Sequence, residues 1–202
     1  SVTARVESVS KASRTRSYMA FTRAMYWAGL AGSVGVAAFT FGFFQLAAHT
    51  PHDNLVLFLR RATELPAFQR HFPELQMKDG RLHRIDGNSA IDLEVEIYNA
   101  RQDEHQLQNF MRYLNPRETA IDDAEIIHTA RLVELCETSP EFCALQVRTA
   151  IQITARKFRE RYQRWYDLNG ASDSICVAIA DIHHQYKMAL AALEAGVACL
   201  RL

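Results

Sequence analysis

The sequence lacks a net charge, and it lacks the short motifs that mark common catalytic sites. Its 23 Lys and Arg residues balance 23 Asp and Glu residues, so the chain as a whole has no electrostatic preference for nucleic acid. It contains no GxSxG, HExxH, CxxC, P-loop or dinucleotide-binding glycine motif. We therefore predict a protein that is not an enzyme, needs no cofactor and binds no nucleic acid.

Charge is also missing from one long stretch, residues 24–48, which contains no Asp, Glu, Lys, Arg or His. A membrane-spanning helix needs about 20 mostly apolar residues. Tyr26 and Trp27 stand where an interfacial aromatic belt would fall. The sequence therefore predicts one transmembrane helix over residues 24–48.

Small residues recur at four-residue spacing within this stretch, which lets helix backbones approach closely in a bilayer. Because the chain offers one such span, the helices packed against it would belong to other subunits. A simple anchor is the alternative. The predicted helix-packing residues are Ala24, Ala28, Gly29, Gly32, Ser33, Ala37, Ala38 and Gly42.

The arm before this stretch, residues 1–23, is basic. Positive charge beside a span marks the side that is not translocated, so we expect the N-terminus in the mitochondrial matrix and the C-terminal domain in the intermembrane space. A Ser- and Arg-rich start without Met is compatible with removal of a transit peptide, and a deliberately shortened chain would look the same. The residues expected to contact partner subunits or anionic lipids are Arg5, Lys11, Arg14, Arg16 and Arg23.

After the stretch, residues 54–64 have a helical pattern with Asn54 as a plausible cap. Alternating residues then flank the Asp86-Gly87 turn, which predicts a β-hairpin with a buried apolar face and a solvated acidic face. An acidic face that meets a basic partner is the alternative. The apolar row is Leu82, Ile85, Ile91, Leu93, Val95 and Ile97, and the acidic row is Asp92, Glu94 and Glu96.

The chain from His105 onward has helical periodicity, with breaks at Asn115-Pro116, Ser139-Pro140 and Asn169-Gly170. The last two helices carry the apolar pattern of an antiparallel helix hairpin over residues 140–200. The predicted fold is mainly α with a small β-hairpin, an α+β fold in which one transmembrane helix precedes a helical domain. The predicted segments are a basic arm at 1–23, the span at 24–48, a helix plus hairpin at 52–100 and a helical domain at 105–202.

The four cysteines do not have the close spacing of a zinc site. An oxidising compartment would permit disulfides, and the register of the predicted helix hairpin excludes a bond between Cys176 and Cys199. The pairings left open are those among Cys136, Cys143 and Cys199. Unpaired, buried thiols are the alternative.

Two further stretches carry residues with chemical potential. Glu125 and His128 form a Glu-x-x-His pair, and Asp181 begins a second acid-x-x-His that also contains His183, but the remaining carboxylates of a di-iron bundle are missing, so we predict no metal. Basic and aromatic residues alternate over residues 156–166, which predicts contact with a protein or anionic lipid, or else a solvated face. The basic residues are Arg156, Lys157, Arg159, Arg161 and Arg164.

The order of one span, an apolar helix and a hairpin around an Asp-Gly turn resembles the small domain of the cytochrome c oxidase assembly factor 1 family. The similar part is residues 26–100, through LFLRRATELPAF and GRLHRIDGNSAIDLEVEI. The family's glycine after the first helix is replaced by HFPEL, and the half of the chain from His105 has no counterpart. The resemblance implies a single-span protein of the mitochondrial inner membrane with an accessory or assembly role.

Together these observations favour a non-catalytic accessory subunit of a mitochondrial inner-membrane respiratory-chain complex. Its partners would be other subunits and membrane lipids, including anionic ones. The alternatives are an accessory subunit of mitochondrial ATP synthase, a transient assembly or translocase factor, and a di-metal helical-bundle enzyme.

Overall fold

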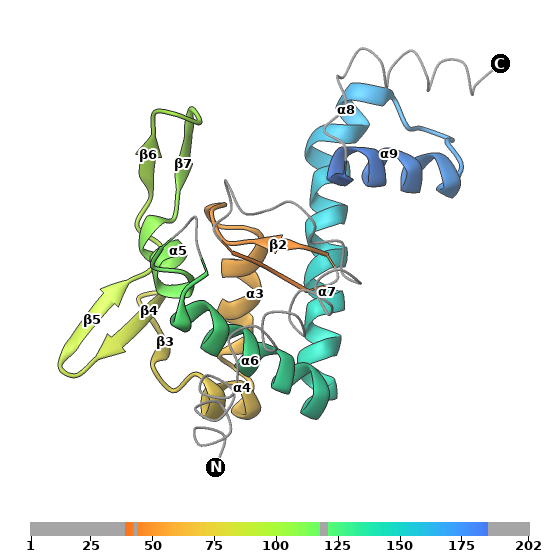
Figure 1. Ribbon diagram of the computed structural model, residues 1–202. Helices are drawn as coiled ribbons and strands as arrows, with labels where there is room; N and C mark the ends of the chain where they lie inside the picture. Colours follow the sequence, from red (N-terminus) through yellow and green to blue (C-terminus); the bar gives the residue numbers. More distant parts are fainter. Residues whose placement is uncertain (1–38, 43, 118–120, 186–202) are drawn as a thin grey trace. The chain divides into compact units, whose positions relative to one another are not determined.

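The computed structural model describes residues 39–42, 44–117 and 121–185 of the 202-residue chain. Over these residues the protein is an α+β structure with three small antiparallel sheets (Figure 1). The chain divides into two compact units, residues 1–149 and residues 150–202, which we call unit 1 and unit 2 and describe separately.

The end of the predicted transmembrane helix is a β-hairpin. Strands β1 (Thr40–Phe41) and β2 (Leu46–Ala47) pair antiparallel across a turn that contains Gly42. Among the described residues, no helix is long and apolar enough to cross a membrane. The prediction of a transmembrane helix, and the fold class built on it, is therefore wrong. The buried apolar side chains of this segment are Phe39, Phe41, Leu46 and Ala48.

The physical reason is that an uncharged run predicts burial without saying whether lipid or protein covers it. Gly42 has a φ of +81°, a left-handed conformation that ends regular helix, and a Cβ at this position would collide with the side-chain amide of Gln146. Gly42 is thus a turn residue rather than part of a helix-packing face. The other predicted packing residues, Ala24, Ala28, Gly29, Gly32, Ser33, Ala37 and Ala38, lie outside the described residues.

Unit 1 contains the helix expected after this stretch. Helix α3 (Asn54–Ala62) is capped by Asp53, whose Oδ1 accepts the backbone N–H of Asn54 at 2.7 Å. Helix α4 (Pro66–His71) follows, with proline in its first turn. The apolar face of α3 is buried through Leu55, Val56, Phe58, Leu59 and Ala62.

The three-stranded sheet contains the predicted hairpin. Strands β3 (Leu75–Lys78), β4 (Arg81–Asp86) and β5 (Ser89–Asp92) pair antiparallel in that order, with Asp86 opposite Ser89 across the turn (Figure 1). The sheet leaves β5 as an edge strand. The expected alternation stops where β5 ends.

Beyond β5 the alternation fails at most positions, although Leu93 is buried and Glu96 exposed as predicted. Glu94, predicted to face solvent, is 2% exposed, whereas Val95 and Ile97, predicted to be buried, are each 38% exposed. The reason is a tertiary contact that local periodicity cannot show: the Glu94 carboxylate turns inward and accepts the backbone N–H of Leu82 at 2.7 Å. The predicted face of solvated acidic residues is therefore wrong at Glu94.

The remainder of unit 1 is mostly helical. Strands β6 (Ile97–Asn99) and β7 (Glu104–Gln106) form a separate two-stranded ribbon, visible as an arm in Figure 1, and β7 replaces the start of the helix expected from His105. Helices α5 (Gln108–Leu114) and α6 (Asp123–Thr138) follow, and α7 (Pro140–Lys157) begins at the predicted Ser139-Pro140 stop and crosses into unit 2.

Unit 2 is a short helical hairpin over its described residues. A π-helical turn (Phe158–Tyr162) and α8 (Gln163–Tyr166) lead to a loop with Gly170 at φ +74°, and α9 (Asp173–Gln185) returns. Tyr162 and Tyr166 pack with Ile179 in a small core. The loop at Gly170 lies where a break between helices was predicted, and the part of the predicted helix hairpin beyond Gln185 lies outside the described residues.

Candidate functional site

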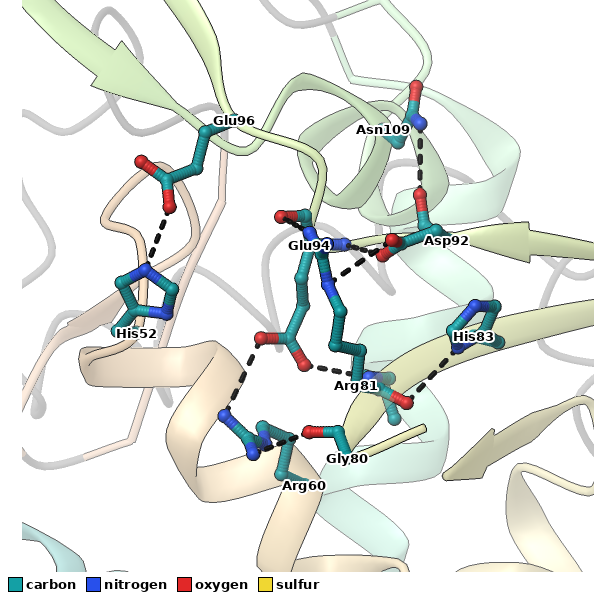
Figure 2. A network of polar contacts seen from close by, with 10 residues as sticks. His52, Arg60, Gly80, Arg81, His83, Asp92, Glu94, Glu96 and Asn109 are labelled. Atoms are coloured by element: carbon teal, nitrogen blue, oxygen red, sulfur yellow. Dashed lines mark hydrogen bonds and ion pairs between the residues drawn. The ribbon is translucent and has the colours of Figure 1, made fainter. Parts of the chain in front are cut away.

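The densest polar network in unit 1 is centred on Glu94 (Figure 2). Its side chain is 3% exposed, and its Oε2 lies 3.6 Å from Arg60 Nη1 of α3. Arg60 also donates through Nη2 to the carbonyl of Gly80 at 2.6 Å. Since Oε1 accepts the N–H of Leu82, both oxygens of the buried carboxylate have a partner within the chain. Glu94 thus ties α3 to β4.

A second branch of the network fixes the end of β5. Arg81 Nε lies 3.2 Å from Asp92 Oδ2, and Arg81 Nη2 donates to the backbone carbonyl of Glu94. Asp92 Oδ1 accepts the N–H of Glu94 at 2.7 Å, and Asn109 of α5 donates to the Asp92 carbonyl at 2.9 Å. Two arginines and two carboxylates are thereby paired, which is the balance expected of a structural network.

The outer part of the network is more exposed. His52 Nε2 lies 2.7 Å from Glu96 Oε1, with side-chain exposures of 70% and 35%. Figure 2 shows this pair beside the Glu94 network, holding the segment before α3 to the segment before β6. An exposed pair of this kind contributes about 0–1 kcal/mol.

A second polar cluster joins the turn before β3 to α5 and α6. Glu74 Oε1 accepts both the Tyr113 hydroxyl and Arg131 Nη1, each at 2.8 Å. Burial, reinforced by the Glu74 carboxylate, raises the pKa of Tyr113. The phenol therefore stays protonated and acts as a hydrogen-bond donor.

In the Glu-x-x-His pair of α6, His128 lies in the core of unit 1 and Glu125 is half-buried. The His128 ring lies 4.4 Å from the Tyr113 ring and 6.1 Å from the Phe72 ring, and burial lowers the pKa of His128 to about 4. Burial raises the pKa of Glu125 to about 7, although Asn115 donates to its Oε2 at 3.0 Å. Within the described residues, no group of three His, Cys, Asp or Glu side chains could hold a metal.

In unit 2, His183 lies among aromatic rings. Its ring stacks on Tyr162 at 4.7 Å between centroids, and its Nε2 lies 2.7 Å from the Tyr166 hydroxyl. Burial, with a smaller effect of the Lys157 ammonium, lowers the pKa of His183. The ring tautomer decides whether the tyrosine hydroxyl or Nε2 is the donor. Asp181 is exposed on the same helix.

Cys136, Cys143 and Cys176 are free thiols. Cys143 Sγ donates to the carbonyl of Cys136 at 3.2 Å. Burial raises the pKa of Cys136 to about 12, which keeps it a thiol rather than a reactive thiolate. Cys199, a candidate for two of the three predicted pairings, lies outside the described residues.

Some of the residues predicted to contact partners or lipids are described by the structure, and the others lie outside the described residues. Arg159, Arg161 and Arg164 are exposed in unit 2, whereas Arg156 and Lys157 are half-buried. Arg156 Nε lies 4.0 Å from Glu160. The basic residues of the N-terminal arm, Arg5, Lys11, Arg14, Arg16 and Arg23, lie outside the described residues.

Sequence reasoning missed the exposed apolar side chains that surround the end of β5. Large apolar residues between β5 and β6 were expected to face the core, but they reach solvent. No local signal could have found them, because the inward turn of Glu94 depends on Arg60, which is remote in sequence. The exposed residues are Ile91, Val95, Ile97 and Tyr98.

Comparisons with family models, with curated proteins and with solved structures found no match to this chain.

Proposed function

We propose that this chain is a non-catalytic subunit that binds partner proteins within a larger assembly. The observation that carries the proposal is the exposed apolar stretch at residues 91–98. Ile91 is 40% exposed, Val95 and Ile97 are each 38% exposed, and Tyr98 is 54% exposed. Single exposed apolar side chains are normal on a protein surface, whereas these four large ones occur within eight residues of sequence.

The charges of the same stretch support this proposal. Asp92 pairs with Arg81, Glu94 with Arg60, and Glu96 with His52, so the acidic residues are engaged within the chain while the apolar residues are left outside. Covering apolar surface contributes about 25 cal/mol per Å². A partner protein on this stretch would remove an otherwise unfavourable exposure.

The narrower form of the proposal is an accessory subunit of a mitochondrial inner-membrane respiratory-chain complex. It rests on the basic, Ser-rich arm at residues 1–23. The predicted span no longer supports it, because Phe39, Phe41, Leu46 and Ala48 are buried in unit 1. An accessory subunit of ATP synthase and a transiently bound assembly or translocase factor are the alternatives.

Native electrophoresis of a mild detergent extract, followed by mass spectrometry, tests the proposal. We expect the chain in a high-mass band, in stoichiometric amount with fixed partners. The double variant Val95→Lys, Ile97→Lys should be absent from that high-mass band, because the added charges would block the partner contact. The matched control is Val177→Lys, because Val177 is 67% exposed on α9 in unit 2 and should tolerate the charge. Recovery of the unaltered chain as a free monomer would contradict the proposal.

A further inference from the structure

A basic ridge, defined as Arg159, Arg161, Arg164 and Trp165, lies on the exposed side of unit 2. All four side chains are exposed, and Trp165 is 40% exposed. Arg161 is three residues before Arg164 and four before Trp165, a spacing that places the three side chains on one side of a helix. Arg159 is two residues before Arg161 and adds charge on the opposite flank of the helical segment.

The core of unit 2 fixes the direction of the ridge. Tyr162 and Tyr166 are each 5% exposed, and they pack with Ile179 of α9 together with Phe158 and Ile175. Because these aromatic side chains hold one side of the helical segment against α9, the arginines between them must face away from α9. The ridge is thus a consequence of the alternation of aromatic and basic residues.

Among the residues that the structure describes, the positive charge of the ridge is not neutralised by ion pairs with nearby acidic residues. Glu160 is the one acidic residue of the segment 156–165, and it lies 4.0 Å from Arg156, which is not part of the ridge. Asp167, which follows α8, is exposed, and so are Asp173 and Asp181 of α9. No ion pair is found for Arg159, Arg161 or Arg164 within the described residues.

Trp165 gives the ridge an apolar element with a fixed orientation. Its ring lies 6.1 Å from the Tyr162 ring and 5.5 Å from the His183 ring, so one side of the indole is packed and the other is open. An indole beside cationic side chains is the combination found at the headgroup level of membranes.

We propose that the basic ridge binds the surface of an anionic phospholipid membrane. Guanidinium groups form paired hydrogen bonds to phosphate. A continuous anionic surface can meet arginines on two sides of a helix, whereas a few carboxylates in fixed positions on a protein would meet fewer of them. The exposed indole side would enter the headgroup region. This binding is peripheral, requires no membrane span and is independent of the partner-binding proposal for residues 91–98.

The test uses the full chain and two kinds of vesicle, phosphatidylcholine alone and phosphatidylcholine mixed with phosphatidylserine. We expect binding to the mixed vesicles and weak binding to the neutral ones. The variant Arg159→Gln, Arg161→Gln, Arg164→Gln should lose about a hundredfold in affinity, because each basic residue near an anionic surface contributes about 1 kcal/mol. The matched control neutralises three exposed arginines of unit 1, Arg70, Arg101 and Arg148, and should keep its affinity.

Fluorescence supplies a second measurement that does not depend on the arginine variants. Trp27 and Trp165 are the two tryptophans of the chain, so a Trp27→Phe variant reports on Trp165 alone. Its emission should shift to shorter wavelength on mixed vesicles, and raised ionic strength should reverse the shift. The proposal would be overturned if the triple variant of the ridge and the triple control variant of unit 1 lost vesicle binding equally. It would also be overturned if the ridge bound an acidic protein but no vesicles.

Discussion

The cores of the two units are centred on different aromatic side chains, although unit 1 also buries Tyr113 and His128 beside its phenylalanines. In unit 1, the Phe142 ring lies 5.0 Å from Phe58, 6.1 Å from Phe68 and 6.2 Å from Phe41, all measured between ring centroids. These rings carry no polar atom, so dispersion and the hydrophobic effect alone hold them. Unit 1 keeps its charges at the margin of this core, in the Glu94 and Glu74 networks.

Unit 2 has no comparable cluster of phenylalanines among its described residues. Its core is formed by Tyr162, Tyr166 and Ile179, with the imidazole of His183 stacked against it. Tyrosine and histidine bury apolar surface and also bring polar atoms that need partners. The comparison teaches that unit 1 depends on shape and unit 2 on a small number of polar contacts.

The largest expected effect is at the centre of the phenylalanine cluster. Phe142→Ala removes the ring that contacts three other phenylalanines and leaves a cavity, so the free energy of unfolding should fall by about 3–5 kcal/mol. Urea unfolding followed by circular dichroism measures the change. The control is Ile151→Ala on the same helix, which should stay within about 0.5 kcal/mol because Ile151 is 62% exposed. Similar losses in both variants would break the comparison.

A smaller effect is expected at the margin of the same core. Glu94→Ala leaves the N–H of Leu82 without its acceptor and Arg60 without its carboxylate, which should cost about 2–3 kcal/mol. Glu94→Gln keeps an acceptor oxygen and should lose less. The matched control is Glu96→Ala, at a side chain 35% exposed, where about 1 kcal/mol or less is expected. A loss at Glu96 equal to that at Glu94 would contradict the structural role of the network.

Unit 1 also shows which structural features the sequence predicts and which it does not. Local signals predicted α3, the turn at Asp86-Gly87 and the helix start at Pro140, because caps, turn residues and periodicity act within a few residues. The buried position of Glu94 depends on Arg60, which is remote in sequence. Periodicity therefore assigned the carboxylate to solvent and the neighbouring apolar residues to the core.

The failure at residues 39–48 has a different cause. Absence of charge indicates removal from water, and a lipid bilayer and a protein core satisfy that condition equally. Gly42 was counted as a small residue for helix packing, whereas its left-handed φ makes it a turn residue. In unit 2, Arg159, Arg161 and Arg164 are exposed, whereas Arg156 and Lys157 of the same predicted contact stretch are half-buried, and the contact itself stays a prediction.

The pH dependence of unit 1 should be small because two buried groups oppose each other. Burial raises the pKa of Glu125 from 4.5 to about 7, so the folded state binds the extra proton and stability falls as pH rises from 4.5 towards 7. Burial lowers the pKa of His128 from 6.5 to about 4, so stability rises as pH rises from 4 towards 6.5.

Replacing either Glu125 or His128 should reveal the effect of the other residue on the pH dependence of stability. Glu125→Gln should give an unfolding free energy that increases between pH 4.5 and 6.5, and His128→Phe should give one that decreases over the same range. Each slope has an upper limit of about 1.4 kcal/mol per pH unit for a single proton. Denaturant unfolding at several pH values measures both slopes. Slopes of the same sign in the two variants would exclude this opposition.

The smallest effect is expected in the core of unit 2. Tyr166→Phe removes the hydroxyl that lies 2.7 Å from His183 Nε2 but keeps the buried ring, so α9 should be destabilised locally by about 0.5–1.5 kcal/mol. Hydrogen exchange of the α9 amides measures this change, with the α3 amides as an internal reference. The control Tyr98→Phe removes an exposed hydrogen bond to Asp103 and should leave both helices unchanged. If Tyr166→Phe left exchange in α9 unaltered, ring packing alone would hold unit 2, and the distinction between a core held by shape and a core held by polar contacts would no longer stand.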